Sequence, residues 1–165
     1  MPSNATSVFI RHPKPDDYYE VIASVNDWWG GRSMADMLPK LFFVHFRDTS
    51  FIAEKDNKIV GFLIGFLSQT FPDEAYVHFL GVHPDFRKQG IARKLYESFF
   101  EAARQRDRSI VRLITASVNK ESIAFHTHIG FQIEPQDTQI DGIPVYQNYD
   151  GRCNDRVLFV KRLSG

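Results

Sequence analysis

The chain lacks several features that would point to particular classes of protein. It has 165 residues but one cysteine, Cys153, so no disulfide can form within it. Twenty lysines and arginines balance 20 aspartates and glutamates, which leaves no net charge to attract nucleic acids or anionic membranes. No run is apolar enough for a signal peptide or a membrane-spanning helix. These absences predict a cytoplasmic protein with neither a nucleic-acid nor a membrane partner.

Repeats, low-complexity tracts and linkers are also missing from the sequence. With 43% hydrophobic residues the chain can build one core, and we therefore expect a single domain over residues 1–165. The six histidines and the cysteine show no metal-ligand spacing, so we expect no metal.

What the sequence does contain is an ordered series of strand-like and helix-like runs. Predicted strands cover residues 8–11, 50–54, 59–68, 76–82, 111–118, 131–133 and 156–162. Predicted helices cover 18–25, 34–42, 91–106 and 119–129, and Pro39 is a candidate break in the second of them. A turn at 56–58 predicts an antiparallel hairpin. The strand, helix and strand from 76 to 118 predict a parallel pair. The fold is therefore α/β with a mixed sheet.

The segment Arg87-Lys88-Gln89-Gly90-Ile91-Ala92 lies between a predicted strand and a long predicted helix. The first turn of a helix leaves about four main-chain N–H groups unpaired at the positive end of the helix dipole. Gly90 lets the main chain approach a ligand closely. The segment predicts an anion site built from the main chain.

A second motif runs from Asn119 to His126 and closes with Ile129-Gly130-Phe131. Together with Val82-His83-Pro84-Asp85-Phe86 before the first motif, the pair resembles the GNAT superfamily of N-acetyltransferases. The resemblance spans nearly the whole chain. It implies a mostly antiparallel sheet of six to seven strands, parallel at strands four and five, with about four helices. It also implies direct transfer of an acetyl group from acetyl-CoA to a primary amine of a small molecule or peptide.

The resemblance also implies which residues bind the donor. Leu80 and Val82 correspond to the strand edge that pairs with pantetheine, and the segment 87–92 corresponds to the pyrophosphate loop. Asn119 and His126 correspond to the thiol end. The predicted donor-binding residues are Leu80, Val82, Arg87, Lys88, Gln89, Gly90, Ile91, Ala92, Asn119 and His126.

Two histidines are the predicted catalytic residues. Strand alternation places His78 on one face with Leu80 and Val82, and its spacing resembles that of a histidine in the aralkylamine branch of the family, so we expect a general base. The alternatives are a packed sheet histidine at this position and Glu74 as the base.

His126 stands where the family commonly has a tyrosine that protonates the leaving thiolate. A neutral imidazole can also donate one N–H, so His126 is a candidate acid and thiol contact. A histidine on the helix surface with no chemical role is the alternative.

The acceptor is predicted to contact Trp28, Trp29 and Arg32, in a loop with two glycines. The alternative is that the tryptophans tie the first helix to the sheet. Gly81 either lets the thioester approach the strand or marks a bulge. The strand at 156–162 is expected to be exposed and able to pair in a homodimer.

Two other functions fit the same motifs. One is a transferase for a longer acyl-CoA, and the other is a non-catalytic module that binds or senses acyl-CoA.

Overall fold

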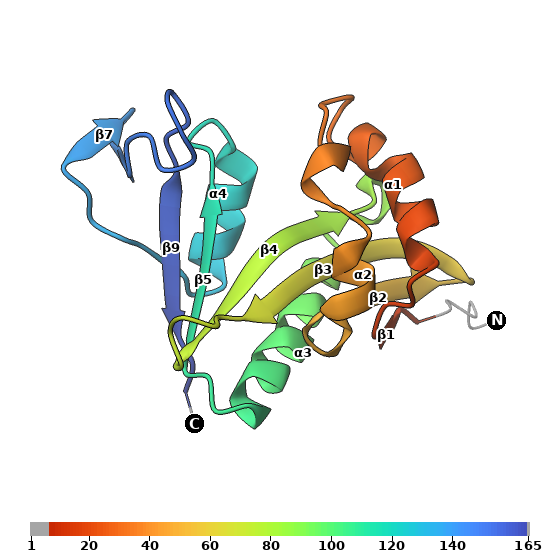
Figure 1. Ribbon diagram of the computed structural model, residues 1–165. Helices are drawn as coiled ribbons and strands as arrows, with labels where there is room; N and C mark the ends of the chain where they lie inside the picture. Colours follow the sequence, from red (N-terminus) through yellow and green to blue (C-terminus); the bar gives the residue numbers. More distant parts are fainter. Residues whose placement is uncertain (1–6, 165) are drawn as a thin grey trace.

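The computed structural model describes residues 7–164 and has a seven-stranded mixed sheet at its centre (Figure 1). The strand order is β1-β2-β3-β4-β5-β9-β6, and only β4 and β5 pair in parallel. The bounds are β1 (Phe9–Arg11), β2 (Phe51–Lys55), β3 (Lys58–Leu67), β4 (Glu74–Val82), β5 (Ile110–Thr115), β6 (Gln132–Ile133) and β9 (Val157–Arg162). The predicted mixed sheet with its parallel pair is confirmed.

Four α-helices flank this sheet: α1 (Asp17–Trp28), α2 (Leu41–His45), α3 (Ile91–Gln105) and α4 (Lys120–His128). The predicted second helix is broken at Pro39, the break that proline indicated, into a 3-10 turn at Ala35–Met37 and the short helix α2. None of the helices within residues 7–164 has the length and apolar character needed to cross a membrane.

The sheet separates two apolar clusters. On one face α3 packs over the strands through Leu95 and Phe99, with α4 beside it through Ile123. On the other face α1 packs through Val21 and Val25 against Phe62 and Phe79, and this second group is called the α1 cluster below. Burial of these two faces holds the helices to the sheet, since a fully buried aliphatic or aromatic side chain contributes about 1.5–3 kcal/mol.

The parallel pairing of β4 with β5 is short. It joins Glu74 to Ile110, Ala75 to Val111 and Tyr76 to Arg112, and the two strands then part (Figure 1). Beyond Tyr76, β4 is paired on one side only, with β3. The sheet is therefore open along the second half of β4.

One residue of β4 has no partner in β3. Ile64 pairs with Phe79 and the next residue, Gly65, pairs with Val77, so His78 is the extra residue of a β-bulge. The bulge overturns the predicted alternation beyond this point. Leu80 and Val82 pack toward α3, whereas His78 stacks on Phe42 beside the α1 cluster.

The C-terminal strand is not an exposed edge. β9 lies between β5 and β6 and pairs with both. The prediction that residues 156–162 are free to pair in a homodimer was therefore wrong. A second hairpin, β7 (Thr138–Ile140) and β8 (Ile143–Val145), precedes β9 and turns at Asp141 and Gly142, both with positive φ.

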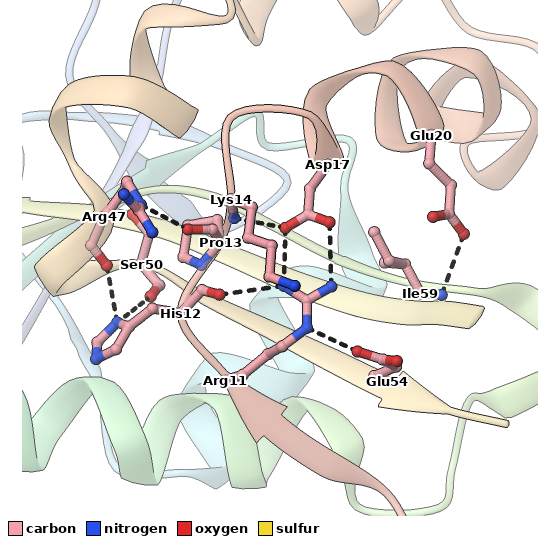
Figure 2. A network of polar contacts seen from close by, with 10 residues as sticks. All are labelled: Arg11, His12, Pro13, Lys14, Asp17, Glu20, Arg47, Ser50, Glu54 and Ile59. Carbon is pink, nitrogen blue, oxygen red and sulfur yellow. Dashed lines mark hydrogen bonds and ion pairs between the residues drawn. The ribbon is translucent and has the colours of Figure 1, made fainter. Parts of the chain in front are cut away.

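An ion-pair network joins the N-terminal elements (Figure 2). The Arg11 guanidinium donates to both carboxylate oxygens of Asp17, at 2.8 and 3.0 Å, and to Glu54 at 2.6 Å. The main-chain N–H of Lys14 also donates to Asp17, at 2.6 Å. These bonds fix the start of α1 to β1 and β2. Burial alone raises the pKa of Asp17, but the Arg11 and Lys14 bonds outweigh it and hold this pKa below its usual value.

Replacing Asp17 by Asn tests this network. The amide loses the two charge-assisted bonds to Arg11, so we expect the free energy of unfolding at pH 7 to fall by about 1–3 kcal/mol. Because the pKa of Asp17 is lower in the folded state, its contribution is lost as the pH falls through that value, and the difference between variant and parent should narrow in acid.

Urea unfolding at several pH values measures the difference, and Asp16→Asn is the matched control, since Asp16 is exposed and its side chain makes no capping bond. Equal losses in the two variants would contradict the account.

Candidate functional site

The loop between β4 and α3 presents a run of free main-chain donors. Among residues 7–164, no main-chain or side-chain acceptor takes the N–H groups of residues 88–93, and the first bond into α3 is from Lys94 N–H to the Gly90 carbonyl, at 3.1 Å. Gly90 precedes the helix in the left-handed region, with φ 79°, and adds no capping side chain. The main-chain N–H groups of residues 88–93 are therefore free at the start of α3, and the anion site itself stays a prediction.

The side chains of this loop behave differently from one another. The Arg87 guanidinium turns back and donates to the carbonyl oxygens of Val82, at 3.2 Å, and Trp28, at 2.5 Å. It therefore ties the loop to the ends of β4 and α1. Lys88 and Gln89 are exposed. A bound anion would be held chiefly by the main chain, and the exposed Lys88 would add a positive charge nearby.

The open side of β4 offers hydrogen-bonding groups to a ligand. The His83 N–H donates to Val60 in β3, at 2.8 Å, and because main-chain groups alternate along a strand, those of Leu80 and Val82 point away from β3. They face the gap left by β5. The predicted donor residues Leu80 and Val82 therefore form an edge that no strand pairs and that leads into the N–H-rich loop, with the Val82 carbonyl taken by Arg87.

Gly81 is explained by packing. A Cβ atom there would lie 2.7 Å from the Trp29 ring and 2.8 Å from the Phe62 ring. The bulge that Gly81 was considered to mark is at His78 instead. Trp29 also contacts Phe79, with ring centroids 5.0 Å apart, so this tryptophan lies across β4.

The other two predicted acceptor residues lie in different environments. Trp28 is buried in the α1 cluster against Phe62. Arg32 is exposed in the loop after α1, and within residues 7–164 its guanidinium makes no hydrogen bond or ion pair.

His78 is held in a defined orientation at the bulge. Its Nε2 lies 2.6 Å from the Met37 carbonyl oxygen, and its ring stacks on Phe42 with centroids 4.4 Å apart and planes 14° apart. A carbonyl oxygen only accepts, so in this contact Nε2 carries the proton. In the neutral ring the lone pair is then on Nδ1, which is the atom able to accept a proton.

Glu74, the alternative base, lies where β4 and β5 are still paired. Its carboxylate accepts from Arg112 Nε at 2.8 Å, and Arg112 also binds Glu134. Burial opposes the charge of Arg112, but the two carboxylates raise its pKa. Glu74 is therefore committed to an ion-pair network that joins β4, β5 and the segment after β6.

His126 is buried between α3 and α4. Its Nδ1 donates to the Ser122 carbonyl oxygen at 2.7 Å, and its Nε2 accepts from the Tyr96 hydroxyl at 2.6 Å. Burial lowers the pKa of His126 to about 4. The neutral ring has no free N–H, so the surroundings favour a role in joining the two helices.

Tyr96 was missed by sequence reasoning, because nothing in a helical run shows that a tyrosine meets a histidine 30 residues away. Asn119 caps the start of α4, where its side-chain oxygen accepts the Ser122 N–H at 3.3 Å. No three His, Cys, Asp or Glu side chains within residues 7–164 gather where they could hold a metal ion.

Comparisons with known proteins agree with this geometry. Residues 12–131 match the Acetyltransferase (GNAT) family. An uncharacterized N-acetyltransferase of Methanocaldococcus jannaschii is 36% identical over 89 residues, which are 52% of this chain and 39% of that protein. L-2,4-diaminobutyric acid acetyltransferase of Halomonas elongata is 32% identical over 98 residues, 57% of this chain and 50% of that protein. The matched residues span half or less of the length of each of these two relatives.

Solved structures resemble nearly the whole fold. Ard1 from Thermoplasma volcanium superposes with a TM-score of 0.75 at 21% identity, over 96% of this chain and 99% of that one. Diaminobutyrate acetyltransferase EctA from Paenibacillus lautus, solved with L-2,4-diaminobutyric acid and coenzyme A, gives a TM-score of 0.70 at 22% identity, over 94% of each chain. These likenesses confirm the predicted fold.

The buried His126 gives a testable dependence of stability on pH. Its pKa falls from an ordinary value of 6.5 to about 4 on folding, so between these values the unfolded chain binds a proton that the folded chain does not. The contribution of His126 to the free energy of unfolding is complete above pH 6.5 and is lost as the pH falls toward 4. The loss should reach about 3 kcal/mol, because each pH unit corresponds to about 1.36 kcal/mol.

Urea unfolding between pH 4 and 7 measures this loss, and we expect His126→Gln to remove it. The exposed His128 on the same helix supplies the control variant His128→Gln, which should keep it. An identical pH dependence in His126→Gln and the parent would show that His126 titrates as it does in solvent.

Proposed function

The chain belongs to the acetyltransferase (GNAT) family, and we propose that it moves an acetyl group from acetyl-CoA to a primary amine by direct transfer within one domain. One observation carries the proposal: an unpaired edge of β4 leads into a loop whose main-chain N–H groups at residues 88–93 are free. That arrangement suits a ligand with amide groups along its length and a phosphate group at one end.

The residues present fit such a donor. The N–H groups of the loop suit the pyrophosphate. The N–H groups of Leu80 and Val82 and the Leu80 carbonyl suit the pantetheine amides, whereas the Val82 carbonyl already accepts from Arg87. The space around Gly90 is open, since a Cβ there would meet nothing within 4 Å. The side-chain amide nitrogen of Asn119, the residue that caps α4, suits a contact with the thiol end of the donor. When bound, acetyl-CoA supplies a thioester as the reactive group.

In the transfer, the amine nitrogen forms a bond to the thioester carbonyl carbon, and the carbon–sulfur bond breaks to leave the thiolate. The amine loses one proton and the thiolate gains one, so no further reactant is needed. We assign the proton-accepting step to His78 Nδ1, because Nε2 is held by the Met37 carbonyl. An N–H group of Leu80 or Val82 donates to the carbonyl oxygen as negative charge develops there.

His126 is assigned a positioning role on the thiol side. Its two ring nitrogens already bind Ser122 and Tyr96, and it therefore sets the distance between α4 and α3. The relatives that act on L-2,4-diaminobutyric acid support a small primary amine as the acceptor.

Replacing His78 by Ala tests the base. Removing a general base typically lowers kcat by about 10²–10⁴-fold, and we expect a loss of that size. Release of free thiol from acetyl-CoA measures kcat, with His128→Ala as the control. An unchanged kcat in His78→Ala would rule out His78 as the base.

Replacing Gly90 by Ala tests the donor loop. Forcing a Cβ into the left-handed region costs about 1–2 kcal/mol, which the loop can relieve by moving its N–H groups. We expect about a tenfold weaker Kd for coenzyme A by calorimetry. Gly151→Ala, also at positive φ but in the loop before β9, should bind coenzyme A as the parent does. An unchanged Kd in both variants would count against the loop as the donor site.

A panel of amines distinguishes a transferase from a non-catalytic acyl-CoA module. Binding of acetyl-CoA without thiol release for any amine would favour the module.

A further inference from the structure

The C-terminal end of α1 is capped by a side chain from the donor loop, residues 87–93. The last four carbonyl groups of a helix have no partner within the helix and lie at the negative end of its dipole. The last turn of α1 contains no basic residue of its own. The Arg87 guanidinium supplies a positive charge there, because its Nη2 donates to the Trp28 carbonyl oxygen at 2.5 Å. The donor loop thus holds the end of a helix that lies 59 residues earlier in the chain.

The second contact of Arg87 makes the guanidinium a bridge. Its Nε donates to the Val82 carbonyl oxygen at the end of β4, at 3.2 Å. The guanidinium is planar and rigid, so two of its donors fix the ends of β4 and α1 relative to each other. An arginine that served only to attract a phosphate would need neither contact.

Residues 29–35, called the acceptor loop below, depend on the last turn of α1 for their hydrogen bonds. The N–H groups of residues 29–31 donate to main-chain oxygens of that turn, at 2.8–3.2 Å. The Asn26 side-chain oxygen accepts the N–H groups of residues 34 and 35, at 2.8 and 3.0 Å. The acceptor loop includes Trp29 and Arg32, two of the residues predicted to contact the acceptor.

The middle of the acceptor loop has little packing to hold it in place. Gly30 and Gly31 have φ of 65° and 88°, and a Cβ at either would meet no atom of residues 7–164 within 4 Å. Arg32 and Ser33 are exposed. Trp29, at the start of the loop, packs on β4. The position of residues 30–33 therefore follows from the position of the end of α1, which Arg87 holds.

We propose that Arg87 is a positioning residue for the acceptor rather than a ligand of the donor phosphates. Its guanidinium joins the donor loop to the end of α1, so a ligand that fixes the main chain at residues 88–93 also fixes the acceptor loop. This inference rests on the proposed acetyl transfer, because it assigns how the donor and acceptor sides of the same site are held together.

Amide hydrogen exchange of the full chain, with and without saturating coenzyme A, tests this bridge. In the parent, coenzyme A should slow the exchange of residues 88–93, and it should also slow that of the acceptor loop by about fivefold or more, the lower end of the coupling found between linked sites. In Arg87→Met, which removes both bonds, the slowing at residues 88–93 should remain and that of the acceptor loop should disappear.

Calorimetry separates the bridge from an effect of charge on the donor. The Kd of Arg87→Met for coenzyme A should stay within about fivefold of the parent value, because one exposed charge contributes little. Arg93→Met is the matched control. Arg93 is exposed in the first turn of α3, and within residues 7–164 its side chain makes no hydrogen bond or ion pair, so this variant removes the same charge without a bond to α1. It should keep the slowing of the acceptor loop.

Arg87→Lys keeps the charge but has a single ammonium in place of the fork. Coenzyme A should therefore slow the acceptor loop less in this variant than in the parent, and the variant provides the test if Arg87→Met does not fold, which thermal melting shows. An effect in Arg87→Lys as large as in the parent would show that charge alone is sufficient and would overturn the bridge.

Two further results would overturn the inference. One is slowing of the acceptor loop that persists in Arg87→Met, or that is absent from the parent although residues 88–93 are protected. The other is a Kd for coenzyme A at least tenfold weaker in Arg87→Met than in Arg93→Met, which would make the guanidinium a phosphate ligand. Both results would leave the proposed donor site standing. Absence of protection at residues 88–93 in the parent would remove that donor site, and the inference with it.

Discussion

The early end of the pairing between β4 and β5 is the constraint on which the rest of the site depends. Three residue pairs hold the strands together, and the ion pairs of Arg112 with Glu74 and Glu134 reinforce that point. Beyond it, no strand pairs with the outer side of Leu80 and Val82, so that among their main-chain groups only the Val82 carbonyl has a partner, the Arg87 guanidinium. An unpaired strand edge in the middle of a sheet is costly, because hydrogen-bonding groups without partners are unfavourable once water is excluded. A ligand that pairs with the edge removes this cost.

The bulge at His78 completes the site on the other side of the strand. One extra residue in β4 turns His78 and Phe79 toward the same face, where the imidazole meets Phe42 and the Met37 carbonyl. Without the bulge, Leu80 and Val82 would lie on the face that carries His78. The bulge thus places the side chains of Leu80 and Val82 on the opposite face of the sheet from the His78 side chain, within five residues.

The sequence predicted those features that depend on neighbours along the chain. The order of strands and helices and the N–H-rich loop at Gly90 depend on local pattern, and both are present. The face of His78 was predicted wrongly because a bulge depends on register with β3. The surroundings of His126 could not be predicted because Tyr96 lies 30 residues away on another helix. The hairpin of β7 and β8 was not predicted. Asp141-Gly142 is a common turn sequence, but strands of only three residues each are too short to show an alternating pattern.

Amide hydrogen exchange at Leu80 and Val82, with and without coenzyme A, tests most directly whether the open edge of β4 is the donor site. The account predicts that both amides exchange as unpaired groups in the free protein and become protected when coenzyme A binds, together with the amides of residues 88–93. Coenzyme A binding that leaves the amides of Leu80 and Val82 unprotected, with protection confined to other parts of the sheet, would contradict it.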